Sequence, residues 1–246
     1  MLNLARVLWR ILRLTLHLFT GMAVVAWRFP AWSVQQRADY VRAWSLGTLR
    51  VAGLGFSVQG QPRGHGTLLI ANHVSWLDIP ALHAACPEAR FVAKADMLRW
   101  PLLGWLARSI GTVFIERERK RDAMRVVHHV AETLQQGGTV AVFPEGTTGP
   151  GPEMLPVHAN LLQAAIAVEA PIQPAVLRFY SPTERFATAA QFIGDTTLLH
   201  SVWRVLSARG LSVEVVVLPA QATAHADRRA LAAHLHQEMQ AVLDRA

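Results

Sequence analysis

A histidine and an aspartate stand five positions apart in the segment 72–78, which reads Asn-His-Val-Ser-Trp-Leu-Asp. A carboxylate that binds one ring nitrogen of a histidine leaves the other nitrogen able to take a proton, so His73 and Asp78 fit a general base. The spacing of Ser75 and Asp78 also fits a capping box at the start of a helix. The residues alone leave both interpretations open.

Two other polar segments follow apolar runs of the same kind. The run 111–115 ends at Glu116 and Arg117, where the guanidinium is placed to bind an anion, although this point is also typical of a solvated helix start. The run 139–143 leads into Pro-Glu-Gly-Thr at 144–147, where Gly146 allows close backbone approach and the amides after it could form an anion-binding concavity. An ordinary exposed turn fits this segment as well.

The elements that must position these side chains alternate between short apolar runs and helical stretches. We expect strands at 67–71, 90–93, 111–115, 139–143, 171–179 and 211–218, with helices at 122–136 and from about 227 to 243. This alternation predicts an α/β fold with a mixed or mostly parallel sheet flanked by helices. Chemistry in such sheets sits beyond the carboxyl ends of strands, where the polar segments fall.

Residues 1–55 have a different composition and are expected to form a membrane-anchoring helical hairpin before an α/β domain at 56–246. Arg6, Arg10, Arg13 and His17 lie on one stripe of a helix, which predicts a helix lying in the lipid headgroup layer. The uncharged stretch 14–27 has 14 residues and is short for a bilayer span, which favours monotopic attachment. A signal peptide or a buried core helix are the alternatives.

The hairpin should turn at Phe29-Pro30, after which Ser33 can cap a second helix that runs towards Arg50. The net charge of the chain is +7, its isoelectric point is near 10.9 and its mean hydropathy is +0.23, which favours a membrane surface or anionic ligands as partners. We find no nucleic-acid recognition motif. The single cysteine, Cys86, makes no internal disulfide, so a cytosol-facing location is expected.

Four segments taken together resemble the four sequence blocks of the glycerolipid acyltransferase family, typified by 1-acyl-sn-glycerol-3-phosphate acyltransferases. The segments are Asn-His to Asp at 72–78, Phe-Ile-Glu-Arg at 114–117, Phe-Pro-Glu-Gly-Thr at 143–147 and Ala-Pro-Ile-Gln-Pro at 170–174. The resemblance covers roughly residues 66–180, through Phe-Val-Ala-Lys at 91–94 and Trp-Pro-Leu-Leu-Gly-Trp at 100–105. The expected hairpin also fits the membrane anchor of this family.

The resemblance implies transfer of a fatty acyl group from acyl-ACP or acyl-CoA to the sn-2 hydroxyl of lysophosphatidic acid, giving phosphatidic acid. His73 would be the general base and Asp78 would fix its tautomer. Lys94 and Arg117 match positions that bind the phosphate of the acceptor. The resemblance also implies that Glu145, Gly146 and Thr147, in the third block, bind the substrate. No metal or cofactor is implied, and the expected location is the cytosolic face of the inner membrane.

The sequence departs from the family pattern at two positions. Thr148 stands where an arginine is usual, and Glu116 stands where aspartate is frequent. Loss of a guanidinium removes a bidentate phosphate donor, so the acceptor headgroup is open and a lyso-ornithine lipid is an alternative. A non-catalytic lipid-binding protein is the alternative outside enzymes. A serine hydrolase is disfavoured because no Gly-x-Ser-x-Gly elbow occurs.

Overall fold

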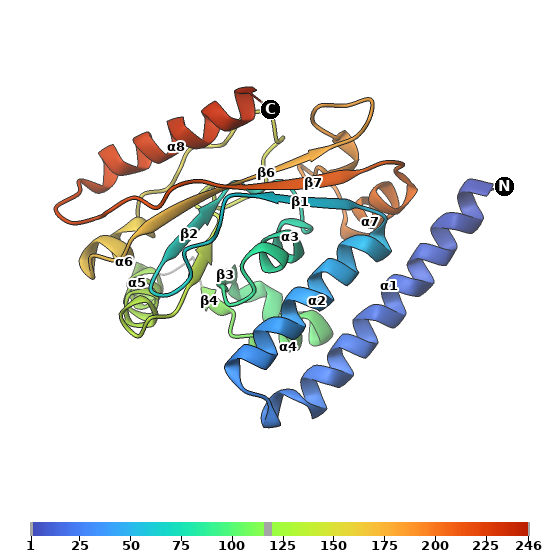
Figure 1. Ribbon diagram of the computed structural model, residues 1–246, viewed down its shortest axis with the longest axis horizontal. Helices are drawn as coiled ribbons and strands as arrows, with labels where there is room; N and C mark the ends of the chain where they lie inside the picture. Colours follow the sequence, from blue (N-terminus) through green and yellow to red (C-terminus); the bar gives the residue numbers. More distant parts are fainter. Residues whose placement is uncertain (1, 116–119, 246) are drawn as a thin grey trace.

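The computed structural model describes residues 2–115 and 120–245, which form a single seven-stranded sheet with helices on both faces (Figure 1). The strand order is β1-β7-β6-β2-β5-β3-β4. The strands are β1 (Gly55–Gln59), β2 (Leu68–Ala71), β3 (Arg90–Lys94), β4 (Val113–Ile115), β5 (Val140–Val142), β6 (Ile172–Tyr180) and β7 (Ser212–Val217).

Five of these strands, β6, β2, β5, β3 and β4, are parallel to one another. Strand β7 pairs antiparallel with β6, and β1 pairs parallel with β7 at the edge of the sheet. The predicted mixed, mostly parallel sheet is therefore confirmed, and all six predicted strands are present. Strand β1 was missed, because its five residues are largely exposed and lack a strong apolar run.

The helices divide between the two faces of the sheet. They are α1 (Leu2–Trp27), α2 (Val34–Ala52), α3 (Asp78–Ala85), α4 (Pro101–Ser109), α5 (Lys120–Gln135), α6 (Leu162–Ala167), α7 (Leu198–Ser207) and α8 (Arg228–Arg245). Figure 1 shows α1, α2 and α3 below the sheet and α8 above it. Each face has its own apolar core, with Leu177 and Leu206 in one and Leu162 and Leu235 in the other.

The N-terminal segment forms the predicted hairpin. Ser33 caps α2 in a reciprocal capping box with Gln36, and Gly53 ends the helix at φ +87°, a backbone conformation that glycine adopts without strain. His17 and Trp44 hold the two helices together: their rings stack with centroids 5.2 Å apart, and the Trp44 indole donates to the His17 carbonyl. The hairpin also contributes Val7 and Leu49 to the core beneath the sheet, so 1–55 and 56–246 share packing.

The two sides of α1 differ in a way that corrects the predicted headgroup stripe. Arg6 and Arg10 face the protein and donate to the carbonyls of Ser207 and Leu206, at the C-terminal end of α7. Cations stabilise a helix C-terminus because they bind its unpaired carbonyls and complement its dipole. Of Arg6, Arg10, Arg13 and His17, only Arg13 is exposed. The exposed large residues of α1 are apolar instead: Leu4, Leu8, Trp9, Leu12, Leu16, Phe19 and Trp27.

By length and mean hydropathy, the segment Asn3–Trp27 could cross a membrane. The prediction from the uncharged stretch of 14 residues gave too short an apolar segment. It left out the first half of α1, where Arg6 and Arg10 face the protein instead of the solvent. The same segment could serve as a membrane anchor without crossing, since its inner side is bonded to the body of the protein.

The carboxyl ends of β2, β5 and β3 lie side by side at one edge of the sheet. The segment 72–78 leaves β2 there, the segment 143–149 leaves β5, and Lys94 ends β3. The parallel order of these strands therefore brings the predicted polar segments together.

Candidate active site

His73 and Asp78 form a hydrogen-bonded pair, with Nδ1 of the imidazole 2.6 Å from Oδ2 of the carboxylate. The Asp78 side chain is fully buried, whereas 22% of the His73 side chain remains exposed. An ionised carboxylate only accepts hydrogen bonds, so Nδ1 is the donor and Nε2 is left with its lone pair. The pair thus has the geometry of an oriented base.

Asp78 also organises the backbone that carries His73. Oδ2 accepts from the amides of Val74 and Ser75 at 2.7 and 2.8 Å. The Ser75 hydroxyl, by contrast, is buried and has no hydrogen-bond partner within the described residues, so the reciprocal half of a capping box is missing. One carboxylate therefore caps the turn and holds the imidazole, so the geometry of both interpretations is present, and the role of His73 as a base stays a prediction.

An aromatic stack extends from His73 into the core. The His73 ring lies against Phe143 with centroids 4.1 Å apart and an interplanar angle of 13°. Phe143 lies against Phe91 at 5.8 Å, and Phe91 meets the edge of His83 at 4.7 Å. Phe143 is the last residue before the Pro-Glu-Gly-Thr loop, so the third block contacts His73 through this ring.

Glu145 is buried beside the same histidine, and both of its carboxylate oxygens accept from backbone amides. Oε1 accepts from His73 at 2.7 Å and Oε2 from Leu155 at 2.8 Å. Burial raises the pKa of this carboxyl, and the two amides and the His73 ring act against the shift. The carboxylate joins three chain segments, at 73, 145 and 155, rather than reaching outward.

The loop residues after Glu145 contact His73 at its backbone carbonyl. The amide of Gly149 donates to the His73 carbonyl at 2.7 Å. Gly146 has φ +73°, and its amide donates to the Phe143 carbonyl at 3.1 Å within the turn. Thr147 is exposed. The peptide of His73 is therefore fixed through both its N–H and its C=O.

Thr148, at the position where the family pattern has arginine, makes a contact within the fold. Its hydroxyl donates to the Phe192 carbonyl, while the Phe192 amide donates to the Val74 carbonyl at 3.0 Å. The side chain therefore ties the third block to the segment that precedes α7. It presents no cation to a ligand.

The predicted phosphate-binding residues stand at the same edge of the sheet as far as the backbone is described. Lys94 ends β3 and pairs in register with Ile115 of β4. Arg117 and Glu116 follow β4 directly but lie outside the described residues. The structure brings together His73, Asp78, Glu145 and Gly146, and the backbone of Lys94 ends beside them.

Sequence reasoning assigned no role to Asn72 or Phe143, which both support the pair. The buried Asn72 amide makes two hydrogen bonds to the main chain of Leu177, at 2.9 and 2.7 Å, and so joins the end of β2 to β6. Both residues occur inside the recognised blocks, which was the available signal. Across 2–115 and 120–245, no group of three histidine, cysteine or acidic residues could hold a metal ion.

Comparisons with known proteins agree with this geometry. The family model described as "Acyltransferase" matches residues 56–178. A Neisseria gonorrhoeae protein named 1-acyl-sn-glycerol-3-phosphate acyltransferase is 37% identical over 239 residues, which is 95% of this chain and 92% of that protein. A Pseudomonas aeruginosa protein named lyso-ornithine lipid O-acyltransferase is 34% identical over 97% of this chain and 93% of its own length.

The fold is also that of a solved structure. The crystal structure of the 1-acyl-sn-glycerophosphate (LPA) acyltransferase PlsC from Thermotoga maritima matches with a TM-score of 0.74. The match covers 99% of this chain and 95% of that one at 19% identity, so it supports the architecture alone.

Proposed function

Because the chain belongs to the acyltransferase family, we propose that it moves a fatty acyl group from acyl-ACP or acyl-CoA to the sn-2 hydroxyl of lysophosphatidic acid, giving phosphatidic acid. The observation that carries the proposal is the 2.6 Å contact between His73 and the buried carboxylate of Asp78. An alcohol attacks a thioester poorly unless its proton is removed as the new bond forms. An oriented imidazole with its second nitrogen available supplies that step.

In the proposed reaction, Nε2 of His73 removes the proton of the acceptor hydroxyl while its oxygen attacks the thioester carbonyl. The tetrahedral intermediate collapses with cleavage of the carbon–sulfur bond, and the imidazolium returns the proton to the departing thiolate. Asp78 stabilises the imidazolium between these two transfers. We assign the Thr147 amide as a donor to the oxyanion, because Gly146 already donates to Phe143.

We assign Glu145 a positioning role in place of the substrate-binding role that the resemblance implied. A carboxylate repels a phosphate, and both oxygens here are occupied by the amides of His73 and Leu155. Phe143 positions the base in the same way, since its ring covers one face of the imidazole. Lys94 and Arg117 remain the proposed cations for the acceptor phosphate.

A lyso-ornithine lipid is the second candidate acceptor. Its support is the contact of Thr148 with Phe192, which leaves that position without the guanidinium expected for a phosphate monoester, and the similarity to the Pseudomonas protein. The chemistry at His73 would be the same for either hydroxyl.

The proposal is tested by supplying purified protein in lipid with a labelled acyl thioester and with lysophosphatidate or lyso-ornithine lipid in parallel. We expect labelled phosphatidate from the wild-type protein and none above background from His73→Ala. Product from the ornithine acceptor alone would keep the mechanism and replace the acceptor. Absence of His73-dependent product with either acceptor would favour the non-catalytic lipid-binding alternative. Running acyl-ACP and acyl-CoA side by side identifies the donor.

We further propose monotopic attachment to the cytosolic face of the inner membrane. The apolar outer side of α1 suits insertion into one leaflet, and the bonds of Arg6 and Arg10 to the end of α7 hold the helix against the body. Crossing the bilayer would separate these partners. Accessibility to a membrane-impermeant thiol reagent at an added N-terminal cysteine, in cells and in inverted membranes, distinguishes the two topologies.

A further inference from the structure

The connection between β6 and α7, residues 181–197, begins at the edge of the sheet where His73 lies. Strand β6 is parallel to β2, and Ala71, the last residue of β2, pairs with Ala175. Strand β6 continues from there to Tyr180, so the connection starts beyond the end of β2. Before α7 begins, the chain contacts the segments that leave β2 and β5, as its hydrogen bonds show.

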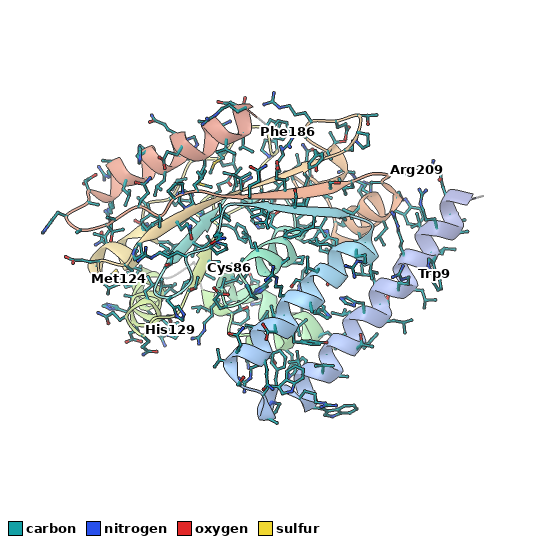
Figure 2. The ribbon with its side chains drawn as sticks, in the orientation of Figure 1. Trp9, Cys86, Met124, His129, Phe186 and Arg209 are labelled. Carbon is teal, nitrogen blue, oxygen red and sulfur yellow. The ribbon has the colours of Figure 1, made fainter. Side chains whose placement is uncertain are left out.

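Both ends of this connection are fixed to neighbouring elements. Arg185 donates to the main-chain carbonyls of Leu243 and Asp244 at the end of α8, and Figure 2 shows Phe186 near that end of the helix. At the other end, the Thr197 side chain caps the start of α7. The stretch between these two points is therefore held close to the edge of the sheet.

Phe192 lies in this stretch, and its main chain binds both segments of the site. Its amide donates to the carbonyl of Val74 at 3.0 Å. Its carbonyl accepts from the hydroxyl of Thr148, directly after the third block. Gln191 adds another bond, from its side-chain amide to the Pro150 carbonyl at 2.6 Å. Residues 191–192 therefore link the two segments of the site to each other.

Two further contacts hold the same region together. Gly151 has φ +100°, a conformation that favours glycine, and a Cβ there would lie 3.6 Å from Val74 and 4.0 Å from Phe186. The Trp76 indole donates to the hydroxyl of Ser201 on α7 at 3.2 Å. Val74 and Trp76 are thus both bonded to α7 or to the connection that precedes it.

The bond from Phe192 completes the support of the main chain at His73 and Val74. The amide and the carbonyl of His73 are bonded to Glu145 and to the amide of Gly149. The amide of Val74 donates to the Asp78 carboxylate that also binds the imidazole. Phe192 is the donor to the fourth group, the Val74 carbonyl. A rotation of the Val74 peptide would therefore disturb the contact between the imidazole and its carboxylate.

We propose that residues 191–192 form a strap that positions the imidazole of His73 for proton transfer, with Thr148 and Gln191 as the positioning residues that hold the strap. The proposal rests on the proposed function, in which His73 is the base. A misplacement of about 1 Å near a reacting group can cost on the order of 10²-fold in rate. Loss of one hydrogen bond from a strap with several attachments should cost less, about tenfold.

The test compares two substitutions at Thr148 with the same change elsewhere in the connection. Thr148→Val keeps the shape of the side chain and removes the hydroxyl, whereas Thr148→Ser keeps the hydroxyl. Thr196→Val is the matched control, because the Thr196 hydroxyl donates to the Ile193 carbonyl at 2.7 Å, and this bond does not involve the site. Acyl transfer is measured with lysophosphatidate or lyso-ornithine lipid, whichever gives product.

We expect Thr148→Val to lower kcat about tenfold, with the KM for the acceptor within about twofold of wild type. Thr148→Ser should restore kcat to within about threefold, and Thr196→Val should behave like wild type. Gln191→Met should lower kcat by about threefold, since it removes only the bond to Pro150. The double variant of Thr148→Val and Gln191→Met should lose less than the product of the two single losses, because both act through one strap.

Hydrogen exchange measures the strap without acyl transfer. In Thr148→Val, the main-chain amides in fragments containing 73–76 and 191–192 should exchange about tenfold faster, while fragments from α8 stay unchanged. Unchanged exchange at 73–76 would overturn the proposal, and so would an equal loss of kcat in Thr196→Val or a loss confined to KM. Absence of His73-dependent transfer in the wild-type protein would instead overturn the proposed function, while exchange still shows whether the strap holds the turn at His73.

Discussion

The aromatic stack of His73, Phe143, Phe91 and His83 has a histidine at each end, and only His73 has the geometry of an oriented base. His73 faces a buried carboxylate and keeps part of its ring exposed, whereas His83, on α3, is 4% exposed and has no acidic partner in the described contacts. Burial lowers the pKa of His83 to about 4, opposed by the Pro87 carbonyl, and keeps the ring neutral. Both rings belong to the same stack, so the stack itself does not distinguish them. They differ in two respects: His73 has an acidic hydrogen-bond partner and a partly exposed ring, and His83 has neither.

The largest effect is expected when His73 loses its acidic partner and so becomes more like His83. Asp78→Asn should lower kcat by about 10² to 10⁴ because an amide can donate to Nδ1 and favour the wrong tautomer, and because the imidazolium loses its counterion. Steady-state acyl transfer measures the change, with vesicle binding as the control for folding. A variant within threefold of wild type would show that His73 acts without this carboxylate.

The second prediction separates positioning from substrate binding at Glu145. Glu145→Gln should lower kcat by about 10- to 100-fold, because the amide presents a donor to one of the two backbone amides that the carboxylate now accepts from. The KM for lysophosphatidate should change little. Lys94→Ala is the matched variant, for which we expect the opposite pattern, with KM raised more than kcat is lowered.

A large rise in KM with unchanged kcat in Glu145→Gln would return this residue to the substrate-binding group. A drop in kcat that also shifts the pH dependence of kcat/KM would indicate that the ring of His73 has moved relative to Asp78.

Substitution of Phe143, in the middle of the stack, should lower kcat less. Phe143→Leu keeps an apolar side chain beside His73 but removes the flat surface 4.1 Å from the imidazole, so we expect a three- to tenfold fall in kcat. Phe143→Tyr retains the ring and is the rescuing control. Equal losses in both variants would assign the effect to general packing.

The segments that form the candidate site were predictable from the sequence because their residue types and order are local. His73, Asp78 and the loop at 144–147 each follow a strand whose apolar run is evident, and parallel strands place their ends together. The role of Glu145 was not predictable, because its partner amides at 73 and 155 belong to other segments. Spacing shows that an acid is present but not what it contacts.

The orientation of α1 was also beyond the sequence. A helix with a basic stripe and an apolar side can pack against the protein with either of these two sides. In α1 the basic stripe faces inward because the end of α7, far along the sequence, supplies the carbonyl acceptors. The fold class and the hairpin could be predicted, since periodicity and the Ser33 cap are local signals. The side of α1 that meets lipid required the tertiary structure.

The smallest effect on activity is expected at the other end of the stack, where His83 should contribute to acid sensitivity alone. The unfolded chain binds a proton at His83 below about pH 6.5, whereas the folded chain resists it until about 4, so stability falls as the pH drops through this window, by up to about 3 kcal/mol. In His83→Leu the free energy of unfolding should fall less between pH 7 and pH 5 than in wild type, by about 2 kcal/mol, with kcat within twofold of wild type at pH 7. Denaturant unfolding at the two pH values measures this, with the exposed His65→Gln as the control that keeps the full acid loss. An unchanged acid loss in His83→Leu would show that burial does not set His83 apart from the exposed histidines, and the contrast with His73 would then rest on the Asp78 contact alone.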